Sequence, residues 1–199
     1  MKILSFVRAA IATCAIVLTA HASAAVLEVN SSGILTGAKD VSIAGKLYNV
    51  SFADGSCTSI FAGCDSVSDF TFTDQTSAAA AGNALLNQVF LDTGTYKFDT
   101  VTTKILGCTY ESNCTTLIPF RTVSSQDGSF GAVSVINWAG WTSLTDNLNV
   151  VPTRKIQDLG LTNNRNFAKF ELATEVPEPS SFALMGLAMA GLAFSRRRK

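Results

Sequence analysis

Alternating apolar and polar residues run through most of the chain and predict short β-strands separated by turns. Residues 40–55 show this alternation on both sides of a glycine-containing turn at 44–46, which is typical of a β-hairpin. The same pattern predicts strands in segments 26–30, 69–74, 95–101, 115–123, 131–138 and 167–174. The middle of the chain is therefore expected to be mainly antiparallel β-structure.

One segment, 77–94, has apolar residues at intervals of three and four positions and predicts a helix with one apolar side. Asp74 or Thr76 can cap its N-terminus. Gly94 stands where a helix often ends in the left-handed conformation. The apolar side of this helix should pack on the strands. The expected fold class is α+β, a mainly antiparallel β-sheet or small sandwich with one packed helix.

The first 24 residues have the pattern of a secretory signal peptide. Lys2 and Arg8 precede an apolar stretch at 9–20, and Ala22 and Ala24 form an A-x-A cleavage site. The apolar stretch is short for a bilayer span, which favours cleavage after Ala24 over a retained signal anchor. We expect a signal-peptide helix at 1–24 and export of the remaining chain across the inner membrane.

Removal of the signal peptide takes away the chain's single histidine, His21, together with Cys14. The mature chain then has no imidazole, which excludes Ser-His-Asp and Cys-His nucleophiles and histidine-ligated zinc. The Asp-Gly pairs at 54–55 and 127–128 lack the spacing of a calcium loop. We predict no metal site and no cofactor.

The charge of the exported part differs from that of the whole chain, which is zero. Residues 25–175 contain nine Lys and Arg against fourteen Asp and Glu, a net charge of −5. A mildly acidic chain without a basic patch binds nucleic acid poorly, so no nucleic-acid partner is expected. About 150 residues suffice for one domain with its own core. Residues 25–175 are therefore expected to form a single exported α+β domain.

Four cysteines remain after signal-peptide removal, in two close pairs: Cys57 with Cys64, and Cys108 with Cys114. Export through an oxidising compartment favours disulfides. Neither spacing is the C-x(2–4)-C of a zinc site. Four cysteines allow three connectivities, and we favour the local one, in which each disulfide closes a small loop.

Residues 176–199 combine three features in a fixed order. The first is an extended motif, Pro177, Glu178 and Pro179. An uncharged and largely apolar segment at 180–195 follows, and the last residues are the basic cluster Arg196, Arg197, Arg198 and Lys199. Flanking cations can compensate for a short transmembrane helix, and they remain on the cytoplasmic side. We expect a transmembrane helix at 180–195, with membrane lipid as its partner and the folded domain outside.

This segment resembles the PEP-CTERM sorting signal of exported proteins of Gram-negative bacteria. The resemblance implies recognition by an exosortase, a membrane enzyme regarded as a cysteine-type transpeptidase. Carried onto this chain, it makes 177–179 the sorting motif, 180–195 the transmembrane helix and 196–199 the stop-transfer and retention signal. Proteins with this signal tend to accompany exopolysaccharide production, which implies a destination at the cell surface or in the extracellular matrix.

Two pairs of acids in the exported domain could supply the carboxylates of a glycosidase. They are Asp65 with Asp69, and Asp92 with Asp99. Solvated loop acids are the simpler interpretation, because the sequence does not fix the separation within either pair.

Trp138 and Trp141 could stack on sugar rings. Residues three apart on a strand point to opposite faces, so a shared platform requires a turn at 139–140. Packing in the core or at a sheet edge is the alternative.

Together these patterns predict a non-enzymatic exported protein, tethered to the membrane by its tail and displayed at the cell surface or in the matrix after processing. The alternatives are a polysaccharide-degrading enzyme that uses paired acids and a polysaccharide-binding module that uses surface tryptophans. The expected partners are an exosortase-type processing enzyme, inner-membrane lipid and extracellular polysaccharide.

Overall fold

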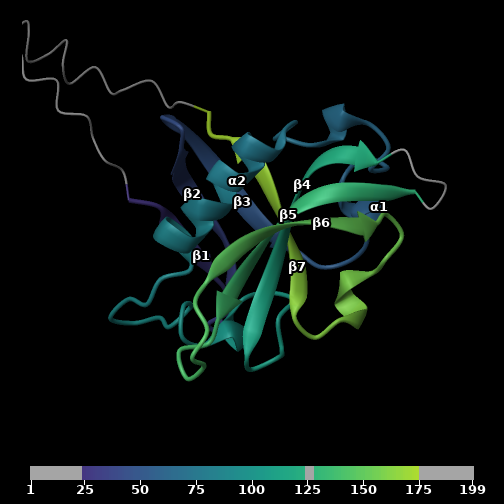
Figure 1. Cartoon of the computed structure of the whole chain (residues 1–199). Helices are drawn as coiled ribbons and strands as arrows, with labels where there is room; N and C mark the ends of the chain where they lie inside the picture. The colour runs from purple at the N-terminus through teal and green to yellow at the C-terminus, as the bar shows by residue number, and fades with distance from the viewer. Residues whose placement is uncertain (1–23, 124–127, 175–199) are drawn as a thin grey trace, which may run out of the picture.

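The computed structural model describes residues 24–123 and 128–174, which make up nearly all of the expected exported domain (Figure 1). The expected transmembrane helix at 180–195 and, except for Ala24, the expected signal peptide lie outside the described residues. Within the described ranges, no helix combines the length and apolar character needed to span a membrane.

Seven strands form one mixed sheet. They are β1 (Val26–Val29), β2 (Leu35–Ile43), β3 (Lys46–Ala53), β4 (Asn113–Val123), β5 (Ser129–Trp138), β6 (Asn147–Arg154) and β7 (Arg165–Leu172). The spatial order is β1-β2-β3-β7-β4-β5-β6, and all neighbours are antiparallel except the parallel pair β4 and β7. The α+β class is confirmed, with a single mixed sheet.

The hairpin predicted at 40–55 is formed by β2 and β3. Its turn consists of Ala44 and Gly45, with φ angles of 48° and 79°, between the paired residues Ile43 and Lys46. Positive φ at both turn positions matches the right-handed twist of paired strands. Glycine adopts this conformation at little steric cost, so Gly45 helps to set the register of the hairpin.

Strand β6 is not predicted by alternation, because asparagines and Pro152 interrupt its apolar residues. It lies at one edge of the sheet, where β5 is its partner. Proline has no N–H to donate, so within sheets it is found in edge strands or at bulges. Pro152 lies in the edge strand, whereas Pro119 of β4 lies at a register shift. Position in the sheet therefore decides the structure of this segment.

Two segments predicted as strands are not strands. In 69–74, Phe70 and Phe72 are both buried, but they belong to cores on opposite faces of the sheet. That segment therefore passes from one face to the other. Segment 95–101 is a loop with one isolated bridge, between Asp92 and Lys97.

Helix α2, Gln75–Ala84, continues into a π-helical segment, Leu85–Val89, and confirms the predicted helix over most of its length. The Asp74 side chain caps it by accepting a backbone N–H of the first turn at 2.9 Å. The helix ends where the buried Phe90 enters the core. The prediction for Gly94 is wrong, because Gly94 lies beyond the helix and does not have a positive φ.

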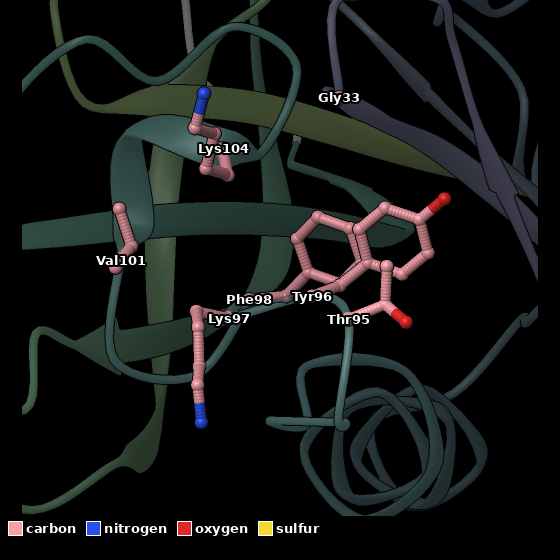
Figure 2. Close-up of a pocket in the computed structure, with 7 residues that line it drawn as sticks. All are labelled: Gly33, Thr95, Tyr96, Lys97, Phe98, Val101 and Lys104. Atoms are coloured by element: carbon pink, nitrogen blue, oxygen red, sulfur yellow. The ribbon is translucent and has the colours of Figure 1, made fainter.

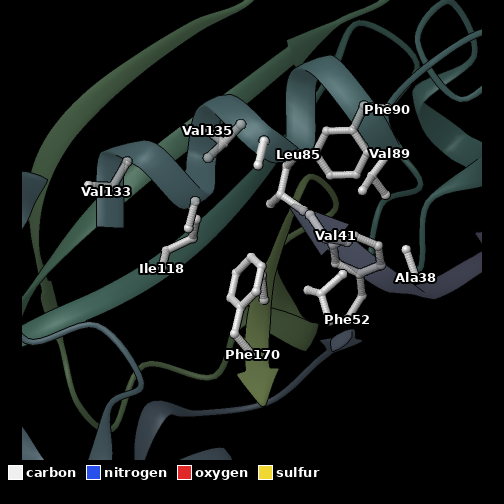
Figure 3. Close-up of a cluster of buried hydrophobic side chains, with 14 of the residues drawn as sticks. Ala38, Val41, Phe52, Leu85, Val89, Phe90, Ile118, Val133, Val135 and Phe170 are labelled. Carbon is white, nitrogen blue, oxygen red and sulfur yellow. The ribbon is translucent and has the colours of Figure 1, made fainter. Parts of the chain in front are cut away.

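The larger hydrophobic core lies between α2 and one face of the sheet (Figure 3). Its members include Ala38, Val41, Phe52, Leu85, Val89, Phe90, Ile118, Val133, Val135 and Phe170. Helix and sheet are in close contact at Gly82, where an added Cβ atom would lie 2.5 Å from Cδ2 of Leu148. The absence of a side chain at Gly82 therefore allows this packing distance.

A smaller core covers the opposite face of the sheet. It contains Cys57, Phe61, Cys64, Phe70, Leu117, Phe130, Ala132, Leu159 and Phe167. The short helix α1, Cys57–Ile60, and the residue that follows it, Phe61, belong to this layer. The ring of Phe61 meets that of Phe167 edge-on, with centroids 5.6 Å apart.

The two ends of the described domain lie at the same end of the sheet. Strand β7 finishes beside the start of β3, where Tyr48 pairs with Leu172 and the N–H of Ala173 donates to the carbonyl of Leu47 at 2.9 Å. Strand β1 starts beside the second half of β2. The opposite end of the sheet carries segment 92–112 and the connection between β5 and β6.

Candidate functional site

Segment 92–106 lies at the end of the sheet opposite to Thr174, and two fully buried asparagines hold it there. Asn137, at the end of β5, donates from its side-chain amide to the carbonyl of Phe98 at 2.8 Å. Asn166, in β7, donates in the same way to the carbonyl of Leu106 at 2.5 Å. Each asparagine supplies a hydrogen bond that a buried loop carbonyl needs, so the sheet fixes both ends of 98–106.

Strand β2 and a buried threonine hold the same segment. The N–H of Leu106 donates to the carbonyl of Leu35 at 3.0 Å, and Leu35 forms an isolated parallel bridge with Ile105. The hydroxyl of the fully buried Thr102 donates to the carbonyl of Tyr110 at 3.0 Å. The loop is therefore held in one conformation from several sides.

The loop forms a pocket of about 370 Å³ (Figure 2). The pocket is lined by Gly33, Thr95, Tyr96, Lys97, Phe98, Val101 and Lys104. The half-buried ring of Tyr96 stacks on the buried ring of Phe98, with centroids 5.2 Å apart and planes at 15°. The pocket therefore combines stacked aromatic rings with two lysines.

Asp92 fixes the shape of the loop beside this pocket. Its carboxylate accepts the N–H of Asp99 at 3.2 Å and both the N–H and the hydroxyl of Thr100, at 3.1 and 2.7 Å. It also pairs with Lys97 at 3.4 Å. Burial acts to raise the pKa of Asp92, but the hydrogen bonds from Thr100 and the charge of Lys97 outweigh it and lower the pKa. Asp92 is thus an ionised carboxylate that stabilises the loop.

Asp99 lies close to Asp146, and each carboxyl group affects the pKa of the other. Burial and then the charges of Asp146 and Asp92 raise the pKa of Asp99. Burial also raises the pKa of Asp146, against the stabilisation that its carboxylate gains from the N–H of Trp138 at 2.7 Å. Neighbouring acids of this kind titrate as a coupled pair.

The other candidate acid pair, Asp65 and Asp69, belongs to a local turn. The carboxylate of Asp69 accepts the N–H groups of Asp65 and Ser66, at 3.0 and 2.9 Å. These bonds close the start of the 3₁₀ turn Val67–Asp69.

The acid beside Asp99 is Asp146, which comes from a distant part of the sequence.

Trp138 and Trp141 differ in their surroundings. Trp138 ends β5 and is partly buried, and its indole Nε1 is buried without a hydrogen-bond partner among the described residues. Trp141 lies in the connection to β6 and is 70% exposed. A turn separates them, in which the N–H of Thr142 donates to the carbonyl of Ala139 at 2.9 Å. Trp141 is the one of the two that presents its ring to solvent.

Both disulfides have the local connectivity that we favoured. The Cα atoms are 5.7 Å apart in Cys57–Cys64 and 5.6 Å apart in Cys108–Cys114. The first lies in the smaller core and the second in the larger one. Cys114 pairs with Asn137 across β4 and β5, and Asn137 holds Phe98. The second disulfide therefore closes a loop beside segment 92–106.

Of the residues assigned to sorting and cleavage, the structure describes Ala24 alone. Ala24 is exposed and is separated from the start of β1 by Ala25. The remaining ones lie outside the described residues: Ala22, Pro177, Glu178, Pro179, Arg196, Arg197, Arg198 and Lys199. In the part of the chain that the structure describes, no group of three or more His, Cys, Asp or Glu is arranged to hold a metal ion.

Sequence patterns do not reveal the pocket or the contact between Asp99 and Asp146. These residues are far apart in the chain, and the connection after β5 brings Asp146 to the loop. One available signal is Asn137, a polar residue at a buried position near the end of the apolar segment 131–138. A buried amide in a strand needs a hydrogen-bond partner, which indicates a segment packed over it.

These features define a small disulfide-bonded α+β domain in which many polar side chains stabilise their own loops. Comparison with known families shows a PEP-CTERM protein-sorting motif at residues 175–199, which confirms the resemblance of the C-terminal segment. No curated protein and no solved structure matches the chain. The motif marks the chain as a sorted, exported protein.

Proposed function

We propose that this chain is a non-enzymatic surface or matrix protein, delivered by an exosortase-type enzyme that recognises its C-terminal segment. The transmembrane helix at 180–195 holds it in the inner membrane until processing. The disulfide-bonded domain is the part that is displayed. Its role is to remain folded outside the cell. There it presents the end of the sheet that carries segment 92–112 to other components.

The observation that carries this proposal is the position of β7. This strand lies between β3 and β4 in the middle of the sheet and ends at Leu172, just before the sorting motif at 175–199. Within the described residues, the backbone hydrogen bond that follows β7 runs from Ala173 to Leu47. All seven described strands precede the motif, so processing beyond Thr174 leaves the central strand in place.

The acids support a non-enzymatic role. Asp92 and Asp69 hold backbone N–H groups. The carboxylate of Asp146 accepts the N–H of Trp138 at 2.7 Å, and Asp99 lies beside it. A hydrolase would need one carboxyl group to reach the scissile bond and another to act from a separate position. Asp92 and Asp146 are better explained as acceptors of backbone N–H groups.

The sorting role is tested by intact mass and cell fractionation of the protein expressed in a host with an exosortase. The test variant replaces Pro177, Glu178 and Pro179 with alanine. The matched control replaces Ser180 and Ser181 with alanine, which alters the neighbouring residues and keeps the motif. We expect the native chain and the control to lose their C-terminal segment and to leave the inner membrane, and the motif variant to keep both. Retention of residues 180–199 in all three chains would show that the segment acts only as an anchor.

A second candidate function, glycan contact, is favoured by the exposure of Trp141. Its indole ring, which is 70% exposed in the connection between β5 and β6, offers a flat apolar surface for a sugar ring. Trp141→Ala should then weaken retention on a polysaccharide column, whereas Leu144→Ala, in the same connection and also exposed, should not. Equal retention of all three proteins would exclude Trp141 as the contact.

A further inference from the structure

The charged residues that line the pocket in segment 92–106 are both lysines, although the domain as a whole is acidic. Its charged lining residues are Lys97 and Lys104, whereas residues 25–175 carry a net charge of −5. Lys97 is paired with Asp92 at 3.4 Å. Lys104 is exposed and forms no ion pair within the described residues. The pocket thus offers a cation that is available to an anionic ligand.

The same pocket offers an apolar surface next to hydroxyl groups. The ring of Tyr96 covers that of Phe98, and the side chain of Val101 is partly exposed beside them. Figure 2 shows the hydroxyls of Tyr96 and Thr95 on one side of the pocket and the amines of the two lysines on opposite sides of the rings. A ligand that fits this arrangement has a flat face with C–H groups, peripheral hydroxyls and a negative charge.

The pocket is built before any ligand arrives. Its aromatic floor is held by the hydrogen bond from Asn137 to the carbonyl of Phe98. A turn at its rim is fixed by the N–H of Tyr96, which donates to the hydroxyl of Thr93 at 3.0 Å. The N–H of Lys104 donates to the carbonyl of Val101 at 3.0 Å. A ligand therefore does not have to order this loop, which lowers the entropic cost of binding.

We propose that this pocket binds a carboxylate-bearing sugar residue of an acidic polysaccharide. Its pyranose ring stacks on Tyr96, its carboxylate pairs with Lys104, and its hydroxyls meet the hydroxyl of Thr95. A volume of about 370 Å³ is within the range of small-ligand pockets. A DNA strand fits less well, because its internal sugars have no free hydroxyl to meet that of Thr95.

The position of the pocket suits a displayed domain. The pocket lies at the end of the sheet opposite to Thr174, after which the sorting motif starts. A chain held by its tail therefore presents the pocket away from its attachment. This inference rests on the proposed surface function for its biological setting, but binding itself is measured apart from sorting.

The test is isothermal titration calorimetry with the full-length protein in detergent. The probes are an oligogalacturonate, its fully methyl-esterified form and a single-stranded DNA oligonucleotide. The variants are Lys104→Ala and Tyr96→Ala, and the matched control is Lys46→Ala, an exposed lysine at the opposite end of the sheet. Circular dichroism checks that each variant is folded.

We expect the oligogalacturonate to bind and the ester and the DNA to bind much more weakly. Lys104→Ala should weaken oligogalacturonate binding about tenfold, the size of one hydrogen bond to a charged group. Lys46→Ala should leave binding unchanged. Equal binding of the ester, an equal loss in Lys46→Ala, tighter binding of the DNA, or no heat with the acidic sugar would each overturn the proposal. Because sorting is read by mass and fractionation, failure of one experiment does not decide the other.

Discussion

Asn137 and Phe98 are joined by a hydrogen bond of 2.8 Å between the side-chain amide of one and the backbone carbonyl of the other. Both residues are fully buried, and the bond connects the end of β5 to the floor of the pocket. The amide oxygen of Asn137 has no hydrogen-bond partner among the described residues. This hydrogen bond therefore accounts for much of what the Asn137 side chain contributes to the stability of the domain.

Asn137→Ala should lower the free energy of unfolding by about 2 kcal/mol, because the carbonyl of Phe98 would remain buried without its partner. The measurement is urea unfolding followed by far-UV circular dichroism. Asn149→Ala is the matched control, since Asn149 is an exposed residue of neighbouring β6. It should change stability by less than about 0.5 kcal/mol. Equal losses in the two variants would contradict the role assigned to Asn137.

Asp146→Asn should stabilise the protein at neutral pH. Burial raises the pKa values of Asp99 and Asp146, which means that the folded state binds protons at these two groups more tightly than the unfolded chain does. Their stabilising contribution is present below the ordinary carboxyl pKa of 3.8 and is lost as pH rises through the raised values. An amide removes one charge and can still accept the N–H of Trp138. We expect a gain of roughly 0.5 kcal/mol at pH 7, discounted for solvent screening.

Thermal unfolding across the acidic to neutral range checks this prediction. Asp65→Asn is the control for the general effect of removing one negative charge, because Asp65 is exposed. Asp92→Asn should have the opposite sign, since the lowered pKa of Asp92 contributes stability above pH 3.8 that is lost as pH falls. A gain in Asp65→Asn as large as that in Asp146→Asn would indicate a net-charge effect alone.

Gly82→Ala should destabilise the protein although alanine favours helix formation. The added Cβ atom would lie 2.5 Å from Cδ2 of Leu148 and 2.9 Å from Cγ2 of Val135, so either α2 or these packed side chains must move. Overpacking of this kind costs about 1–3 kcal/mol. Gly94→Ala is the control, because no atom lies within 4 Å of its added Cβ. The midpoint of urea unfolding should fall for Gly82→Ala and remain unchanged or rise for Gly94→Ala.

Local signals in the sequence were sufficient for several parts of the structure. The hairpin of β2 and β3 follows from alternation around Gly45, and the start of α2 follows from Asp74. The disulfide pairs follow from short loops between neighbouring cysteines. The C-terminal motif at 175–199 is likewise read from adjacent residues. Each of these depends on interactions between residues that are close in the chain.

Contacts between distant segments were decided by the tertiary structure. Alternation shows which side chains of a strand share a face, but it does not specify the neighbouring strand. It therefore leaves open that β7 inserts between β3 and β4 and that β6, with its Pro152, forms the edge. The contact of Asp99 with Asp146 and the bond from Asn137 to Phe98 arise in the same way. The energies of these contacts depend on burial and on partners that only packing brings together. The pattern of apolar and polar residues along the sequence therefore does not reveal them.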